Sequence, residues 1–239
     1  MSAGKEAARA AILARVRASL GRGPGEAARP DELARRLAGG RPNLIPARSR
    51  VGAEERLALF VRMAEEVAAS TVRCASPDEV PGAVGAFLAG HNLPSELVMA
   101  PEVEGYPWHA APTLTLRKGR ASKDDLTGLT GAFAGIAETG TLMMVAGPKS
   151  PTTLNFLPDN HVVLLPTGRI FGAYEEAWAE LRRQSPRRPP TTVNFITGPS
   201  RTADIEQTMQ LGAHGPRRLH IILVGPDAPP GEAPPGEEG

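Results

Sequence analysis

The densest group of chemically useful side chains lies between two apolar runs, in GPSRTADIEQTMQLGAHGP from Gly198 to Pro216. Hydroxyl and guanidinium groups beside backbone N–H groups that follow a glycine can hold a carboxylate or a phosphate. We therefore expect this stretch to bind an anionic ligand. Its expected ligand-binding residues are Gly198, Pro199, Ser200, Arg201, Thr202, His214 and Gly215.

Two acids of the same stretch, Asp204 and Glu206, are candidate catalytic groups. Residues two apart diverge on a helix but share a face in an extended segment or a turn. A structural alternative is that Thr202 caps a helix and Asp204 lies in its first turn, where the helix dipole favours an acid. That alternative leaves Arg201, Glu206 and the turn at His214 without an explanation.

A third candidate catalytic acid, Glu138, lies in AGIAETGTLMM between two apolar runs. Burial of a carboxyl group without a cation raises its pKa, and such a group can act as a general base, a nucleophile or an anchor for a ligand hydroxyl. We expect its neighbours Thr139, Gly140 and Thr141 to bind ligand. The alternative is an ordinary turn in which Gly140 supplies the positive φ angle.

Polar residues also crowd SPTTLNFLPDNH, from Ser150 to His161, just before an apolar run. We expect Asn155 and His161 to bind ligand at the mouth of a pocket. The alternatives are ordinary turn chemistry, since Pro-Asp-Asn is a common turn sequence, and a structural histidine at the start of a strand. The polar residues of this segment are Ser150, Thr152, Thr153, Asn155, Asp159, Asn160 and His161.

Metal and nucleotide signatures are weak. The possible ligands do not follow the H-x-E or H-x-x-x-H spacing of known metal motifs, and no glycine-rich nucleotide motif occurs, so we predict no metal site. His220 lies within an apolar run and is interpreted as a core residue. The residue types considered as metal ligands are His161, His214, His220, Asp204 and Glu206.

Helices and strands that alternate along the chain must position these groups. The predicted fold is α/β, with an open, mostly parallel sheet flanked by helices. Ligands bind beyond the carboxyl ends of such strands. We therefore expect the loop that begins at Gly198, after the strand over 191–197, to lie at that edge of the sheet. The patterns predict helices over 53–70, 76–90 and 172–184, strands over 71–75, 96–100, 113–119, 161–166, 191–197 and 218–225, and a hairpin or strand–loop–strand over 131–147.

The predicted domains are an N-terminal helical extension with its linker (1–50), the α/β domain (51–225) and a disordered tail rich in Pro, Gly and Glu (226–239). A helix over 5–20 places Ile12, Leu13, Val16 and Leu20 on one face, and a shorter helix follows over 31–40. The first helix either docks on the domain or packs against a partner protein.

Composition narrows the functional classes. Lys plus Arg number 27 against 26 Asp plus Glu, a near-neutral balance that gives no nucleic-acid footprint. The one cysteine, Cys74, excludes an intrachain disulfide and a cysteine-ligated iron–sulfur cluster or zinc site. No signal peptide and no apolar run of about 20 residues is present, so we expect a cytoplasmic protein without a membrane span.

Three segments, AGIAETGTLMM, LPDNHVVLLP and above all GPSRTADIEQTMQLGAHGP, resemble the LUD-domain family, in its lactate utilisation protein C branch (LutC/YkgG-like). The resemblance covers roughly 51–224. It implies a fold similar to the NagB/RpiA/CoA-transferase group. It also implies oxidation of L-lactate to pyruvate together with two partner proteins that carry the iron–sulfur clusters. A chain with a single cysteine fits a subunit that holds no cluster itself.

Three functional hypotheses follow. In the first, the chain is a component of L-lactate oxidation and binds a small carboxylate or an organic cofactor in a polar pocket. In the second, it is an acyl- or CoA-transferase with Glu138 as nucleophile, because Glu-Thr-Gly is similar to the Glu-x-Gly of some CoA-transferases. In the third, it is a non-catalytic assembly or regulatory subunit that docks through its N-terminal helix.

Overall fold

The computed structural model describes residues 3–21, 44–185, 190–204, 208–211 and 215–225, with side chains of 201–214 not described. The chain divides into two compact units, Met1–Asn43 and Leu44–Gly239. The first unit contains helix α1 (Ala3–Ser19), whose residues Ile12, Leu13 and Val16 are exposed. The helix predicted over 31–40 and the tail predicted over 226–239 lie outside the described residues.

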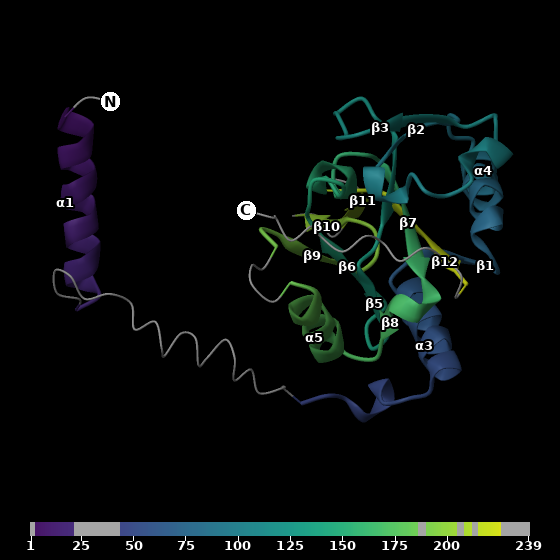
Figure 1. Ribbon diagram of the computed structural model, residues 1–239, viewed down its shortest axis with the longest axis horizontal. Helices are drawn as coiled ribbons and strands as arrows, with labels where there is room; N and C mark the ends of the chain where they lie inside the picture. The colour runs from purple at the N-terminus through teal and green to yellow at the C-terminus, as the bar shows by residue number, and fades with distance from the viewer. Residues whose placement is uncertain (1–2, 22–43, 186–189, 205–207, 212–214, 226–239) are drawn as a thin grey trace. The chain divides into compact units, whose positions relative to one another are not determined.

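A fully parallel six-stranded sheet forms the centre of the second unit (Figure 1). This confirms the predicted α/β class. The two central strands β7 and β12 carry continuous apolar runs because both of their faces are buried. In spatial order the strands are β1 (Ser70–Cys74), β12 (Arg218–Val224), β7 (Asn160–Pro166), β4 (Thr127–Gly131), β2 (Glu96–Met99) and β3 (Thr115–Lys118).

A second, four-stranded sheet was not predicted as a separate layer. The predicted hairpin is confirmed, since β5 and β6 pair antiparallel, and β9 extends it on the other side of β6. The strand predicted over 191–197 therefore belongs to this mixed sheet and not to the parallel one. The order is β8 (Ile170–Phe171), β5 (Ala134–Ile136), β6 (Thr141–Val145), β9 (Val193–Ile196).

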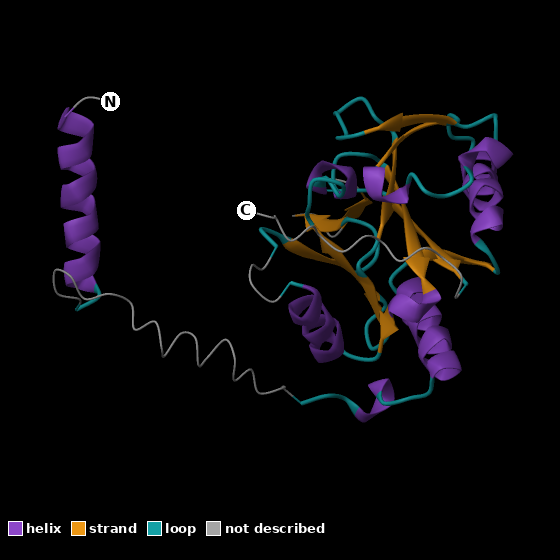
Figure 2. Ribbon diagram, in the orientation of Figure 1, coloured by secondary structure: helices purple, strands orange, loops and turns teal. Residues whose placement is uncertain are grey.

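Three α-helices cover the two sheets (Figure 2). Helix α4 (Val80–Gly90) packs on one face of the parallel sheet, and α3 (Ala53–Glu66) packs between its other face and the mixed sheet. Helix α5 (Tyr174–Gln184) covers the mixed sheet. Short 3-10 helices complete this unit: η1 (Ala47–Ser49), η2 (Pro77–Glu79), η3 (Pro101–Val103), η4 (Trp108–Ala110), η5 (Thr152–Asn155) and η6 (Thr167–Arg169).

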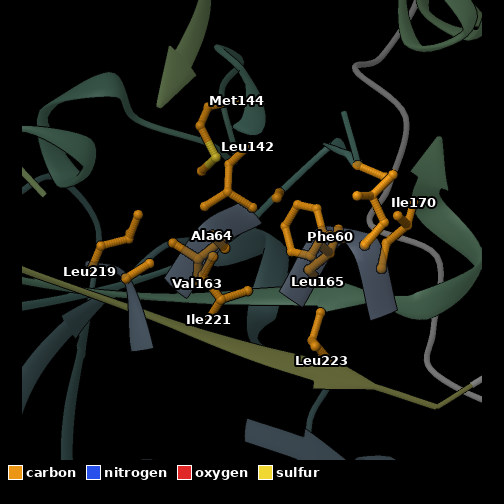
Figure 3. Packing of buried hydrophobic residues seen from close by; sticks show 14 residues of the cluster. Phe60, Ala64, Leu142, Met144, Val163, Leu165, Ile170, Leu219, Ile221 and Leu223 are labelled. Carbon is orange, nitrogen blue, oxygen red and sulfur yellow. The ribbon is translucent and has the colours of Figure 1, made fainter. Parts of the chain in front are cut away.

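One large apolar cluster lies where α3 meets both sheets (Figure 3). Phe60 and Ala64 of α3, both fully buried, pack with Leu165 of β7 and Leu142 of β6. Four α3 residues spaced over two helical turns, Leu57, Phe60, Val61 and Ala64, thus turn one apolar stripe inward, as the sequence pattern predicts.

Two glycines allow the mixed sheet to approach α3 closely. Gly140, at φ +65°, lies so close to the helix that a Cβ atom would be 2.2 Å from the backbone nitrogen of Ala64. Gly198, at φ +74°, would place a Cβ atom 2.4 Å from the carbonyl oxygen of Val67. Both positions combine a left-handed backbone with backbone atoms that cannot move aside, so both require glycine.

No helix within the described ranges is long and apolar enough to cross a membrane.

Candidate functional site

The parallel sheet changes direction between β2 and β4, which are neighbours in space. From β2 the chain continues to β3 at the edge, whereas from β4 the next parallel strand is β7 on the opposite side. The carboxyl ends of two such strands are where open α/β sheets bind ligands. The topology therefore identifies the ends of β2 and β4 as the place to look for functional side chains.

Glu102 occupies this switch point. It follows β2 in η3, and its Oε1 atom accepts a hydrogen bond of 2.9 Å from the backbone N–H of Gly131, the last residue of β4. Its Oε2 atom accepts a hydrogen bond from the hydroxyl of Ser150. The backbone N–H of Glu102 donates to the carbonyl oxygen of Lys149 at 3.2 Å, which fixes the 149–150 loop beside the strand ends.

Burial raises the pKa of the Glu102 carboxyl to about 7, although the hydrogen bonds from Ser150 and Gly131 act in the opposite direction. The residue as a whole is half-buried. A carboxyl group that is partly protonated at neutral pH can both donate and accept a proton. Ser150 was among the polar loop residues expected from the sequence, whereas Glu102 was missed because its local sequence PEVEG has no catalytic signature.

Glu138 lies in the turn between β5 and β6, as predicted, and is buried. Its backbone N–H donates to the carbonyl oxygen of Gly172 at 3.1 Å. Its Oε1 atom accepts a hydrogen bond of 3.4 Å from the backbone N–H of Tyr174, the first residue of α5. An acid near the free N–H groups at a helix N-terminus stabilises that helix. These contacts give Glu138 a structural task beside any chemical one.

Four hydroxyl groups meet next to Glu138. Thr141 Oγ1 is the centre of the group and lies 2.7 Å from Thr139 Oγ1, 3.0 Å from the Tyr174 hydroxyl and 2.7 Å from Thr197 Oγ1. The group joins the hairpin turn, the start of α5 and the end of β9. Thr139 and Thr141 were predicted as ligand-binding residues, and the structure brings them together. Tyr174 and Thr197 were missed because they lie more than 30 residues away in the sequence.

His161 is placed differently from the expected pocket mouth. It lies near the start of β7 and is fully buried, and its Nε2 atom is 2.8 Å from Thr130 Oγ1. Burial lowers its pKa to about 3, which keeps the ring neutral at physiological pH. Its Nδ1 atom has no hydrogen-bond partner among the described residues. The alternative of a structural histidine fits these contacts better than a ligand-binding role.

The rest of the 150–161 loop ties together the amino ends of the strands. The side-chain N–H of Asn160 donates to the carbonyl oxygen of Leu126 at 3.0 Å, and Arg218 donates to its Oδ1 atom at 3.1 Å. Asn155 is buried in η5. Among the described residues, no hydrogen bond links Asn155 or His161 with Glu138. The described residues therefore show no hydrogen bond between these two predicted groups, and the side chains of the third group, from Arg201 onward, lie outside the description.

The loop that begins at Gly198 also lies elsewhere than expected. It follows β9 of the mixed sheet, and the Ser200 N–H donates to the carbonyl oxygen of Pro216 at 2.8 Å, two residues before β12 begins. Gly215 faces Ser200 at close range. The loop thus lies at the amino end of β12, and the prediction that it lies beyond the carboxyl ends of the parallel strands is wrong.

The helix considered for Thr202 and Asp204 is also absent from the described backbone. Residues Arg201–Asp204 form strand β10, which pairs antiparallel with β11 (Thr208–Leu211). The extended alternative for this segment is therefore the correct one. Glu206 and His214 lie outside the described residues. Within the described part of the chain, no three His, Cys, Asp or Glu side chains converge as metal ligands do.

Comparison with known proteins supplies the family. Residues 57–224 match the LUD domain. The chain belongs to the LUD domain family. The match runs from within α3 to the end of β12, so it contains the parallel sheet, the mixed sheet and every candidate site residue. It confirms the resemblance stated from the three sequence segments.

Curated relatives match shorter parts of the chain. A protein of Neisseria meningitidis serogroup B, described as uncharacterized, is 43% identical over 100 residues, which cover 42% of each chain. Lactate utilization protein C of Anoxybacillus flavithermus is 35% identical over 97 residues, covering 41% of this chain and 43% of that protein. That of Halalkalibacterium halodurans is 33% identical over 107 residues, covering 44% and 46%. Each alignment spans less than half of the relative.

A solved structure supports the fold. The crystal structure of a DUF162 family protein from Deinococcus radiodurans aligns with a TM-score of 0.55 and 23% identity, covering 73% of this chain and 99% of that chain. At this identity the similarity establishes the α/β architecture of the LUD domain and nothing about its ligands.

Proposed function

We propose that this LUD-domain chain is a component of a system that oxidises L-lactate to pyruvate. The observation that carries the proposal is the family membership, together with relatives at 33–35% identity that bear the name lactate utilization protein C. The matched segments include less than half of those relatives, so their role is extended to this chain as a hypothesis about the shared domain.

We assign electron transfer to iron–sulfur partner proteins. Iron–sulfur clusters are usually held by four cysteine thiolates, and this chain has only Cys74. Cys74 is buried in β1, and burial raises the pKa of its thiol, which disfavours the thiolate that binds metals. In this division of tasks, the present chain binds a small carboxylate or an organic cofactor, and its partners carry the electrons.

Two regions of the LUD domain offer polar groups for such a ligand. One is the hydroxyl group cluster of Thr139, Thr141, Tyr174 and Thr197, which continues through Gly198 to Ser200. Hydroxyls and backbone N–H groups there suit a carboxylate. The other is the carboxyl edge of β2 and β4 with Glu102.

A gene deletion tests the proposal. We expect the deletion strain to lose growth on L-lactate as sole carbon source while growing normally on pyruvate, and the wild-type gene to restore growth. Complementation with Glu138→Gln separates the roles of that acid: Gln can still accept the N–H of Tyr174 but can be neither base nor nucleophile. Normal growth of the deletion strain on L-lactate, in a host without a second lactate dehydrogenase, would refute the function.

An acyl- or CoA-transferase with Glu138 as nucleophile is the alternative enzyme class. The burial of Glu138 and its hydrogen bond with Tyr174 support a helix-anchoring role more than that of a nucleophile, which needs an accessible oxygen. Incubation with acyl-CoA donors followed by mass spectrometry of the peptide around Glu138 decides between them. A covalent adduct that disappears in Glu138→Gln would favour the transferase.

A further inference from the structure

We infer that strand β9 joins two copies of this chain by antiparallel pairing with the same strand of a second copy. The two-fold axis of this dimer passes through Phe195, so the four-stranded mixed sheets of both copies form one continuous sheet. The inference concerns a surface of the LUD domain and does not depend on the function proposed above.

The first argument is the open edge of β9. It is the last strand of the mixed sheet and pairs with β6 on one side only (Figure 1). The Ala146 N–H donates to the carbonyl oxygen of Thr192 at 3.0 Å, so this pair and every second pair after it are the hydrogen-bonded ones. The alternate residues Val193 and Phe195 therefore direct their backbone N–H and C=O groups away from β6. Within the described ranges, no backbone partner pairs with this outer side of β9.

The second argument is that this edge carries no charge. Charged side chains and very short strands usually prevent edge pairing, and the other edge strands of the two larger sheets have them. Strand β1 carries Arg73, β3 carries Arg117 and Lys118, and β8 is two residues long. Strand β9 lies in the uncharged segment TTVNFIT, 191–197. A two-fold contact brings the same surface of both copies together, so a charged strand repels its own copy and an uncharged strand does not.

The third argument is the aromatic cluster at the centre of this edge. The Phe195 side chain is 38% exposed, and its ring centre lies 5.3 Å from that of Tyr174 and 5.7 Å from that of Trp178, both on α5. Aromatic residues make up only 4% of the chain, yet three of them meet here. Pairing about an axis through Phe195 keeps α5 of both copies on the same face of the joined sheet. The two aromatic clusters then meet and cover Phe195, as is typical of the centre of a protein interface.

Other occupants of this edge fit less well. The C-terminal segment 226–239 of the same chain is rich in proline, which cannot donate a hydrogen bond to a strand ladder. A strand of a different protein needs no compatibility of β9 with itself, so the uncharged sequence is not required for it. That occupant predicts a monomeric purified chain, and so does an aromatic cluster that only holds α5 on the sheet.

Sedimentation equilibrium of the purified full chain, at concentrations up to about 100 µM, tests the inference. We expect the wild type to reach twice the mass of one chain. Phe195→Lys and Phe195→Glu should each weaken the dimer at least about ten-fold, because like charges then face each other across the axis. An equimolar mixture of these two variants should restore dimers, since opposite charges then face each other. Thr115→Lys is the matched control: it adds the same charge at an exposed position of the edge strand β3 and should dimerise as the wild type does.

Cross-linking through a new thiol is a second measurement. The one cysteine of the chain, Cys74, is buried, so Phe195→Cys adds an exposed thiol. Directly opposed residues of a hydrogen-bonded antiparallel pair have Cα atoms about 5.5 Å apart, which a disulfide can bridge. We expect oxidation to cross-link Phe195→Cys into dimers and to leave the control Thr115→Cys mainly monomeric.

Four results would overturn the inference. They are a monomeric wild-type chain, unchanged dimer affinity in Phe195→Lys, no dimers in a mixture of the folded charge variants, and equal cross-linking of Phe195→Cys and Thr115→Cys.

Discussion

The carboxylate of Glu102 and the backbone N–H of Gly131 are joined by a hydrogen bond of 2.9 Å across the carboxyl ends of two neighbouring parallel strands. This bond makes the Gly131 amide a reporter of the charge on Glu102. It also links a titrating group directly to the sheet, so the protonation of Glu102 and the stability of the LUD domain depend on each other.

The raised pKa of Glu102 predicts that stability falls as pH rises. The unfolded chain releases this proton near pH 4.5 and the folded chain near pH 7, so between these values the folded state binds more protons. Ionisation of Glu102 therefore lowers the unfolding free energy by up to about 3 kcal/mol. Urea unfolding at pH 5, 6, 7 and 8 should show a weaker pH dependence for Glu102→Gln than for the wild type. The Gly131 amide resonance should titrate near pH 7.

The control for this prediction is Glu104→Gln, which should behave as the wild type does. Identical pH dependence of the unfolding free energy in Glu102→Gln and the wild type would contradict the raised pKa of Glu102.

The lowered pKa of His161 predicts the opposite trend. The unfolded chain takes up this proton below about pH 6.5 and the folded chain only near pH 3, so stability is present above pH 6.5 and is lost as pH falls. Between pH 6.5 and pH 5 the unfolding free energy should decrease by about 2 kcal/mol because of His161. We expect the unfolding free energy of His161→Gln to decrease less over this interval than that of the wild type. His109→Gln, at an exposed position, is the control.

Replacing Gly140 by alanine should destabilise the LUD domain by about 3 kcal/mol. The new Cβ atom would meet the backbone of Ala64 at 2.2 Å, and φ is +65°. Gly168→Ala adds the same atom where nothing lies within 4 Å and should change the unfolding free energy by less than about 0.5 kcal/mol. Thermal unfolding of both variants measures the difference. Equal stability of the two would mean that α3 can move away from the hairpin.

Thr141→Val should cost about 2 kcal/mol, because it removes the hydroxyl that contacts three others. Valine has nearly the same shape, so the loss is due to hydrogen bonds that are left without a partner. Thr71→Val is the comparison, since the bond of Thr71 to Glu65 is exposed. If both variants lose the same small amount, the hydroxyl cluster is solvated and contributes little. Growth of the Thr141→Val strain on L-lactate then tests whether the cluster also binds ligand.

Helix α1 offers a test of the assembly hypothesis. That hypothesis has the chain dock through this helix, whose apolar residues Ile12 and Val16 are 62% and 49% exposed. We expect Ile12→Ser with Val16→Ser to reduce co-purification of partner proteins without a change in the thermal stability of the LUD domain. The matched pair Ala10→Ser with Ala14→Ser should retain partners. Full retention with Ile12→Ser and Val16→Ser would remove α1 from partner binding.

Local patterns were sufficient for most elements of the fold. The stripe on α3, the apolar runs of β7 and β12 and the hairpin around Glu138 each depend on residues close in sequence. Strand β4 was missed, although it is central, because its sequence TGLTG is rich in glycine and threonine. The sheet to which β9 belongs could not be predicted either, since a short apolar run looks the same in a parallel and a mixed sheet.

The candidate site was harder to predict because its contacts are long-range. Gly131 and Ser150 lie 29 and 48 residues from Glu102, and only the strand order brings them together. The pKa of Glu102 depends on burial, which is a property of the folded domain. The reverse error occurred at Ser200, where a polar loop with a suitable composition proved to be attached to the amino end of β12 through Pro216.

The close approach of Gly140 and Gly198 to α3 provides a criterion for recognising other chains with this geometry. Gly140 lies in the turn before β6 and Gly198 in the loop after β9, yet both face the C-terminal end of α3, at Ala64 and Val67. A sequence that keeps both glycines at this spacing from an amphipathic helix can hold the hairpin and the β9 loop in the same place. A sequence that replaces either one must shift or shorten that helix, and with it the position of the hydroxyl cluster.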